Sequence, residues 1–194
     1  SSASDNAATI LASILKTSDL AEQVSVVVAP LATTVAARSE LNEIEEILDA
    51  AAMLRQDHAA TLQRALLDGL ATGLDYRRED LDSSGQEFKG LMILLTKTSS
   101  YVQSGALRVA SHLNLGDRPE VRRAWEEIEL IAIDDAQPQK SRIAALQLFR
   151  VASWERRLAL GELVHPREPI DIQLAAMASR MPSQSAASYM PIEV

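Results

Sequence analysis

The sequence predicts an all-α protein, an α-solenoid of about ten antiparallel helices stacked in pairs. Three observations lead to this prediction. A short phrase recurs along the chain, apolar residues return at helical spacing, and Ala and Leu dominate while aromatic residues make up only 4%. There is little of the β-branched alternation that would support a sheet.

The recurring phrase opens with a long polar residue, continues through small residues and ends with a bulky apolar residue four positions on. Its copies begin at residues 63, 103, 142 and 173, that is 40, 39 and 31 residues apart. Such spacing is typical of stacked helix pairs, because one pair cannot bury its apolar face alone. We expect the small residues to admit a neighbouring helix, the bulky residue to fill the gap between layers, and the leading residue to reach a carbonyl or loop of the preceding repeat. The copies are Gln63-Arg-Ala-Leu-Leu, Gln103-Ser-Gly-Ala-Leu, Arg142-Ile-Ala-Ala-Leu and Gln173-Leu-Ala-Ala-Met.

The first predicted helix begins at Ser18, and Pro30 should kink it or start a new helix. An amphipathic helix follows from Ser39, and its partner runs from about residue 58 to residue 74. The polar stretch 75–85 predicts a loop between repeats. The apolar stripe of the amphipathic helix is Leu41, Ile44, Leu48 and Ala51.

Residues 88–95 are strongly apolar and predict a buried helix. The helix after it should stop at residues 114–116, where Asn-Leu-Gly supplies a stop signal. Asp117 and Glu120 form a capping-box-like start for the following helix, with Pro119 in its first turn. The apolar residues of these last two helices are Val102, Leu107, Ala110 and Leu113, and then Val121, Trp125, Ile128 and Ala132.

The predicted helix ends near Asp134, and Pro138 restarts the chain. Helices are expected over 143–151, 154–164 and 170–181, with a turn at 165–169, and residues from 182 on look like the start of another helix or a frayed end. The prediction is therefore one helical-repeat domain over 1–194, with repeat pairs at approximately 18–74, 86–114, 117–152 and 154–181.

Composition excludes several classes of function. The net charge of −8 and the pI near 4.9 argue against a nucleic-acid partner, whose phosphates require positive charge. The chain has no cysteine, so it can hold no disulfide, thiolate metal site, iron–sulfur cluster or covalently attached c-type haem. No apolar run approaches the roughly 18 residues that span a bilayer. The start lacks signal-peptide features and an initiator Met, and we expect a segment of a larger protein.

The candidate chemical groups do not form a known constellation. The three histidines have no acidic or histidine partner at metal-ligand spacing, and a turn or capping role is expected for His165. Residues 80–85 resemble the first half of a calcium loop, but Leu91 stands where a bidentate Glu is required. The serine pairs lack a nucleophile-elbow context, and neighbouring acidic residues diverge by about 100° on a helix. We expect no catalytic, cofactor-binding or metal residue, and solvated faces for the pairs. The groups are His58, His112 and His165; Ser83-Ser84 and Ser99-Ser100; Glu126-Glu127 and Asp134-Asp135; and Arg77-Arg78, Arg122-Arg123 and Arg156-Arg157.

The stretch from Glu162 to Met181 resembles the HEAT-like repeat region of large planctomycete-type haem-binding proteins, often labelled membrane-bound dehydrogenases. In that family a helix ends in a Leu-Leu-x-Pro-Arg-x-Pro turn and resumes as x-x-Val-Gln-x-Ala-Ala. Segments 36–44 and 66–74 resemble the parts of the family around its first repeat pair. The matching residues of the turn are Leu163, Pro166, Arg167, Pro169, Gln173, Ala175 and Ala176.

The resemblance implies a HEAT-like solenoid within a parent protein that carries an upstream β-propeller dehydrogenase and a downstream cytochrome c domain, outside the cytoplasm. No haem or catalytic residue transfers to this chain. We therefore expect a non-catalytic scaffold or spacer that positions flanking redox domains or a protein partner, without membrane contact or cofactor of its own. The alternatives are a stand-alone protein-interaction adaptor and a HEAT-like nucleic-acid-binding module, which would place its double arginines on one concave face.

Overall fold

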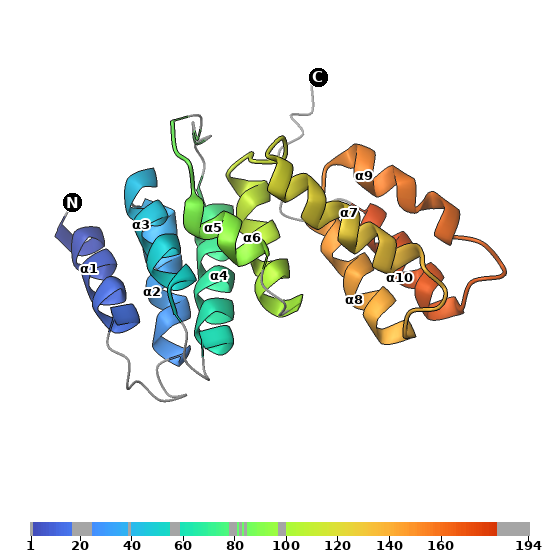
Figure 1. Cartoon of the computed structure of the whole chain (residues 1–194), viewed down its shortest axis with the longest axis horizontal. Coiled ribbons are helices and arrows are strands. Elements are labelled where there is room, and N and C mark those ends of the chain that lie inside the picture. The colour runs from blue at the N-terminus through green and yellow to red at the C-terminus, as the bar shows by residue number, and fades with distance from the viewer. Residues whose placement is uncertain are drawn as a thin grey trace, which may run out of the picture. The chain divides into compact units, whose positions relative to one another are not determined.

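The chain is described by a computed structural model that covers residues 2–16, 25–38, 40–54, 59–77, 81, 83, 85–96 and 100–181. These residues form α-helices and short 3-10 helices, and none of them lies in a strand, so the all-α prediction is confirmed (Figure 1). The helices are α1 (Ser2–Lys16), α2 (Ser25–Arg38), α3 (Leu41–Ala52), α4 (Ala59–Asp75), α5 (Lys89–Leu95), α6 (Ser100–His112), α7 (Pro119–Ile133), α8 (Gln139–Leu148), η2 (Phe149–Val151), α9 (Trp154–Ala159), η3 (Leu160–Leu163) and α10 (Ile170–Arg180).

The chain divides into two compact units, residues 1–124 and 125–194, and the boundary falls within α7. In the first unit α4 packs between α2 and α6, while α3 packs against α5 and α1 contacts both α2 and α3 (Figure 1). The helices bury apolar residues at helical spacing, as expected for amphipathic helices. The stripe predicted for residues 41–51 is buried at Ile44, Leu48 and Ala51, and Leu41 is half-buried.

The tightest helix contact in the first unit is between α2 and α4. A Cβ atom added to Gly69 would overlap the carbonyl oxygen of Ala29, and one added to Gly73 would overlap that of Thr33. The two glycines lie one turn apart on the same face of α4. The backbones of α2 and α4 can therefore approach closely only because these positions carry no side chain.

Two carboxylates of α3 hold the start of α5. The backbone N–H of Phe88 donates to Oε1 of Glu45, and that of Gly90 donates to Oδ1 of Asp49, each at 2.7 Å. These donors have no partner within α5, because the first N–H groups of a helix lie beyond its own carbonyls. Phe88 is fully buried and has a φ of 49°, a left-handed conformation in which a bulky residue is rare. The carboxylates and the buried ring together keep Phe88 in that conformation.

Several details of the first unit differ from the sequence prediction. Pro30 starts no new helix, because α2 runs through it; the residue is exposed, so the carbonyl that its missing N–H leaves unpaired can bind water. The helix α1 was not predicted, although Ala7, Leu11 and Leu15 are buried at four-residue spacing. The start predicted at Ser18, and residues 78–80, 82 and 84 of the loop predicted over 75–85, lie outside the described residues.

The end of α6 and the start of α7 follow the predicted stop-and-start signals with one change. Asn114 has a φ of 55°, and the N–H of Leu115 donates to the carbonyl of Ala110 at 3.0 Å, which is a Schellman ending. Pro119 is the first residue of α7, as predicted. The capping box at Asp117 is wrong, because Arg118 and not Asp117 directly precedes the helix.

In the second unit α10 packs against α8 and against the 3-10 helices η2 and η3. Trp125 stacks near Phe149 with ring centroids 5.5 Å apart, and both are buried. The predicted helix over 154–164 is wrong in part, since its α-helical portion ends at Ala159 and continues as the 3-10 turn η3. Helix α8 begins directly after Pro138, earlier than predicted, and the helix predicted from residue 170 is present as α10.

Candidate contact surfaces

The leading residue of the repeated phrase reaches back to the end of the preceding helix. In α4, Nε2 of Gln63 donates to the carbonyl of Ala51 at 2.8 Å, and in α8, Nε of Arg142 donates to the carbonyl of Ala132 at 3.0 Å. Both side chains are buried, and both acceptors lie in the last turn of α3 or α7. Helix ends leave such carbonyls without an intrahelical partner. In these two copies the leading residue is therefore a helix-end cap provided by the next helix.

Gln and Arg can occupy the same position of the phrase because both side chains place a nitrogen donor at the same distance from the backbone. Nε2 of Gln and Nε of Arg lie the same number of bonds from Cα, and each carries an N–H donor. The acceptor belongs to the partner helix of the same predicted pair, so the expectation that the residue reaches the preceding repeat is wrong for Gln63 and Arg142. In the fourth copy, Nε2 of Gln173 donates to the carbonyl of Glu168 at 2.8 Å, in the turn before α10.

The small and bulky positions of the phrase meet across two successive copies in the first unit. A Cβ atom added to Gly105 of α6 would lie 2.9 Å from the Cβ of Leu67 in α4. Leu67 and Leu107, the bulky residues of these copies, are both fully buried. This contact is the close approach that the phrase predicts. In the second unit Leu146, the bulky residue of the third copy, is also buried, and its carbonyl accepts a hydrogen bond from Oγ of Ser179 at 2.6 Å.

Arg142 has a second role within the second unit. Its guanidinium forms an ion pair with Glu168, with 3.0 Å between Nη2 and Oε2. The Arg142 side chain is only 4% exposed, so the charge is removed from solvent while one partner compensates it. The ion pair joins α8 to the 165–169 turn and leaves the guanidinium inaccessible to a ligand.

Charged and aromatic groups line the contact between α4 and α6. Asp68 accepts from Nη1 of Arg108 at 3.0 Å, and Nε of Arg64 lies 3.6 Å from the same carboxylate. The guanidinium of Arg64 also lies over the ring of Tyr101, 4.8 Å from its centroid. Partly exposed pairs of this kind contribute only tenths of a kcal/mol each, about 0.2–1. The arrangement fixes side chains along one helix contact and brings no nucleophile to them.

The two histidines that the structure describes, His112 and His165, each contact a neighbouring residue of the fold. Nε2 of His112 lies 3.5 Å from Oδ1 of Asp75, and burial lowers the pKa of His112, a shift that Asp75 opposes and Arg108 assists. Nδ1 of His165 accepts from the N–H of Arg167 at 3.2 Å, which is the turn role expected for it. His58 lies outside the described residues. Among the described residues no three His, Asp or Glu side chains are placed to hold a metal ion.

The remaining sequence candidates are separate from one another. Oγ of Ser83 donates to the carbonyl of Leu113 at 2.7 Å, so the hydroxyl caps α6. Leu91, at the calcium-loop position, is fully buried. Asp134 accepts from Gln137 and from the N–H of Ala136, and these bonds lower its pKa. Glu126 and Glu127 are exposed on α7, and Asp135 is exposed in the turn between α7 and α8. Asp80, Asp82, Ser84 and Ser99 lie outside the description.

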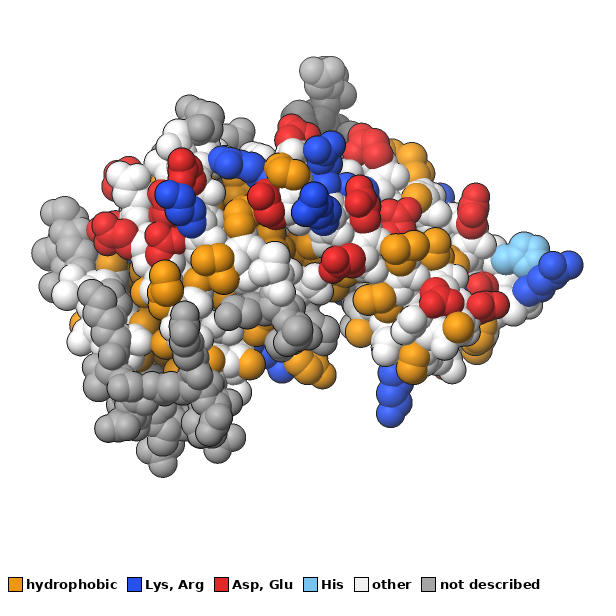
Figure 2. Space-filling view, in the orientation of Figure 1, with side chains coloured by type: hydrophobic (Ala, Val, Ile, Leu, Met, Phe, Trp, Pro, Cys, Tyr) orange, Lys and Arg blue, Asp and Glu red, His pale blue; other side chains and the backbone are white. Residues whose placement is uncertain are grey.

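The double arginines that are described interact within their own units or are exposed. Arg77 donates to the carbonyl of Ala36 at 3.2 Å. Arg156 lies 3.9 Å from Glu129 and over the ring of Trp125, while Arg157 lies over the ring of Trp154. Arg122 and Arg123 are exposed. Acidic and basic side chains are interspersed on the face in view (Figure 2). Such mixing favours a solvated surface over a phosphate-binding one.

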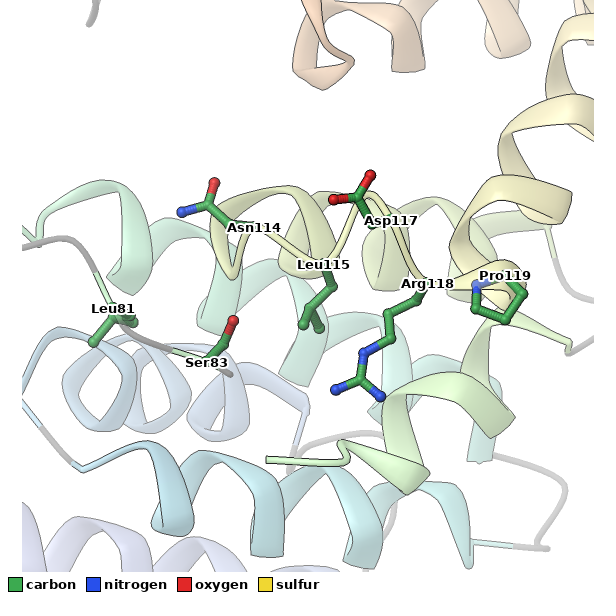
Figure 3. Close-up of a pocket in the computed structure, with 7 residues that line it drawn as sticks. All are labelled: Leu81, Ser83, Asn114, Leu115, Asp117, Arg118 and Pro119. Carbon is green, nitrogen blue, oxygen red and sulfur yellow. The ribbon is translucent and has the colours of Figure 1, made fainter. Parts of the chain in front are cut away.

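An open depression of about 390 Å³ in the first unit is lined by residues 114, 115 and 117–119, between the end of α6 and the start of α7, and by Leu81 and Ser83 of the polar stretch before α5. The side chains of Leu115 and Arg118 point to one side of the loop before α7, and the side chain of Asp117 points to the opposite side (Figure 3). Nη2 of Arg118 donates to the carbonyl of Gln86 at 2.7 Å, so its charge is used to hold the loop. The depression therefore lacks convergent polar groups free to orient a ligand.

Among the described aromatic residues of the second unit, the most exposed is Trp154 on α9. Trp154 and Leu158 are one turn apart and 52% and 45% exposed, and the guanidinium of Arg157 lies 5.7 Å from the Trp154 ring centroid. No residue of α9 is buried. Trp and Arg are enriched among the residues that dominate binding energy in protein interfaces. We call Trp154, Leu158 and Arg157 together the α9 surface. It is the best candidate for contact with another protein.

The chain matches no protein-family model, no curated protein and no solved structure. Within the described part of the chain, no helix has the length and apolar character needed to cross a membrane.

Proposed function

We propose that this chain is a non-catalytic helical-repeat scaffold or spacer that positions flanking domains or a protein partner. The observation that carries the proposal is the identical use of Gln63 and Arg142. Each buries a long polar side chain in order to cap the preceding helix. Residues that recur along the chain thus serve the packing of helix on helix, as in repeat proteins.

The HEAT-like solenoid and the redox context are the finer part of this proposal, and they rest on the resemblance of residues 162–181 to the repeat region of haem-binding dehydrogenases. In this proposal the chain lies between a dehydrogenase domain and a cytochrome c domain, outside the cytoplasm, and holds neither haem nor substrate. The test is the absorption spectrum and intact mass of the native polypeptide that contains these 194 residues. A haem Soret band on a much larger chain supports the redox role. A colourless product of this length contradicts it.

Deleting the chain from the larger protein distinguishes a scaffolding role from a catalytic one. Removal of these 194 residues from the larger chain should leave the activity of the dehydrogenase domain towards an artificial acceptor intact and should abolish electron transfer to the cytochrome domain. The reason is that a spacer sets the effective concentration of one domain near the other. Catalytic activity in the isolated chain would contradict the proposal.

A stand-alone protein-interaction adaptor is the second candidate, and the α9 surface favours it. The substitution Trp154→Ala removes an exposed ring, so it should leave stability nearly unchanged while weakening partner binding by about 2 kcal/mol or more, as at an interface hot spot. The matched control is Tyr76→Ala, which removes an exposed aromatic residue from the first unit. Equal effects of the two variants on binding would rule out the α9 surface.

A further inference from the structure

Helix α5 is too short to be stable without its neighbours in the fold. It has seven residues and packs against α3 on one side and α6 on the other (Figure 1). Helices of this length are marginal in isolation, because the few hydrogen bonds they form do not offset the cost of ordering the first turn. Contacts with α3 and α6 therefore hold α5 in its helical form.

The residue before α5 is held in an unfavourable backbone conformation. Phe88 has a φ of 49°, which is an outlier for a bulky side chain, and its ring is fully buried. A conformation of this kind persists only where the surroundings impose it, and such residues are frequent in switch regions. The surroundings here are the carboxylates of Glu45 and Asp49, which accept from the N–H groups of Phe88 and Gly90 at 2.7 Å each. We call Glu45, Asp49 and Phe88 together the carboxylate clamp.

The contact between α5 and α3 is too close to loosen by small steps. A Cβ atom added to Gly90 would overlap the carbonyl group of Leu48, so the two backbones touch at this point. The leucines of α5 that follow, Leu91, Leu94 and Leu95, are buried. Closely packed contacts of this kind change between discrete arrangements and do not deform continuously. Helix α5 is therefore expected to be either seated on α3 or separated from it.

We propose that residues 86–95 form a unit of the fold that opens separately, and that the carboxylate clamp keeps it closed. The two hydrogen bonds of the clamp are charge-assisted, and such bonds are about twice as strong as neutral ones. Loss of the negative charge on Glu45 and Asp49 weakens both bonds together and removes the support for the left-handed conformation of Phe88. The segment then separates from α3, Phe88 returns to a negative φ, and the buried leucines of α5 reach solvent. The first unit thus contains a conformational device that responds to neutralisation of two carboxylates on α3.

Backbone amide exchange, measured by NMR at neutral pH in low urea, tests both parts of the proposal. In the full chain, residues 92–95 should exchange faster than α4 and with a weaker dependence on urea, because a local opening exposes less surface than unfolding of the whole unit. The double variant Glu45→Gln and Asp49→Asn keeps an oxygen acceptor at each position and removes both charges. It should make the exchange of residues 92–95 at least about tenfold faster. The matched control, Glu43→Gln with Glu46→Gln, removes two charges from other positions of α3 and should leave that exchange unchanged.

Two results would overturn the proposal. If residues 92–95 exchange at the same rate as α4 and with the same dependence on urea, α5 opens only when the whole unit unfolds. If the double variant exchanges at residues 92–95 no faster than the unsubstituted chain, the two carboxylates do not hold the segment. Should the double variant fail to fold, the single substitution Asp49→Asn replaces it, and faster exchange of residues 92–95 is then the expected result.

Discussion

Gly105 of α6 faces Leu67 of α4 at a point where a Cβ atom on the glycine would lie 2.9 Å from the Cβ of the leucine. Cβ atoms do not approach so closely, and Leu67 Cβ is fixed to its own backbone, so a methyl group at residue 105 requires one helix to shift. The two residues occupy the small and the bulky position of successive copies of the repeated phrase. The phrase therefore encodes the separation between these two helices.

The first prediction concerns Gly105→Ala. An alanine in mid-helix gains about 1 kcal/mol of helix propensity over glycine, whereas overpacking costs about 1–3 kcal/mol. We expect the overpacking to dominate and the free energy of unfolding to fall by about 1 kcal/mol, as measured by urea denaturation. Gly116→Ala is the matched control, because a Cβ atom there meets nothing within 4 Å. A Gly105→Ala variant more stable than that control would contradict the packing assigned to the phrase.

The second prediction concerns Gln63→Leu. Leucine has about the same bulk and keeps the apolar packing, but it removes the shorter of the two hydrogen bonds to the carbonyl of Ala51 and leaves only the N–H of Leu54 at 3.3 Å. A net intramolecular hydrogen bond contributes about 0.5–1.5 kcal/mol, and we expect a loss of stability of about 1 kcal/mol. Gln147→Leu, at an exposed position of α8, should change stability by less than about 0.5 kcal/mol. Similar losses in the two variants would mean that the Gln63 bond contributes nothing specific.

The third prediction concerns pH. Burial lowers the pKa of His112 below its ordinary value of 6.5 in the folded state, so the unfolded chain takes up this proton first as the pH falls. Stability from this group is fully present above about pH 7.5 and decreases as the pH falls through 6.5 towards the folded pKa. Chemical denaturation between pH 7.5 and 5.5 should show this slope, and His112→Gln should reduce it.

The pH control is Gln147→Leu, because it changes an exposed position without adding or removing a titratable group and should leave the slope unchanged. Asp75 and Arg108 act on the pKa of His112 in opposite directions, so the direction depends on burial as the largest cause. An NMR titration of His112 tests it independently. A midpoint above 6.5 would show that Asp75 dominates, and the predicted slope would then have the opposite sign.

The sequence was sufficient to predict the helices with a clear apolar period. The residues Val121, Trp125, Ile128 and Ala132 are all buried along α7, as their spacing predicts. Helix α1 was missed because its apolar spacing at Ala7, Leu11 and Leu15 is diluted by small polar residues. Of the two effects expected of Pro30, the start of a new helix is wrong, because whether a helix tolerates proline depends on whether the freed carbonyl faces water, which only the tertiary structure decides.

The role of the phrase was predicted only in part. The contact between Gly105 and Leu67 could be predicted, because each copy of the phrase has small residues in its middle and a bulky residue at its end. The acceptor of Gln63 does not, because Ala51 carries no signal of its own and is twelve residues away. The candidate contact surface on α9 was not predicted, although Trp154 and Leu158 at four-residue spacing with an adjacent double arginine are visible in the sequence.

The central claim is that Gln63 and Arg142, the leading residues of two copies of the phrase, cap the preceding helix through their ε nitrogens. Arg142→Gln keeps an N–H donor at that atom, whereas Arg142→Met keeps the length and loses the donor. Both are compared in a Glu168→Gln background, so that neither leaves an unpaired buried carboxylate. Urea denaturation should find the Gln variant more stable than the Met variant by about 1 kcal/mol. Equal stability, or a more stable Met variant, would contradict the account.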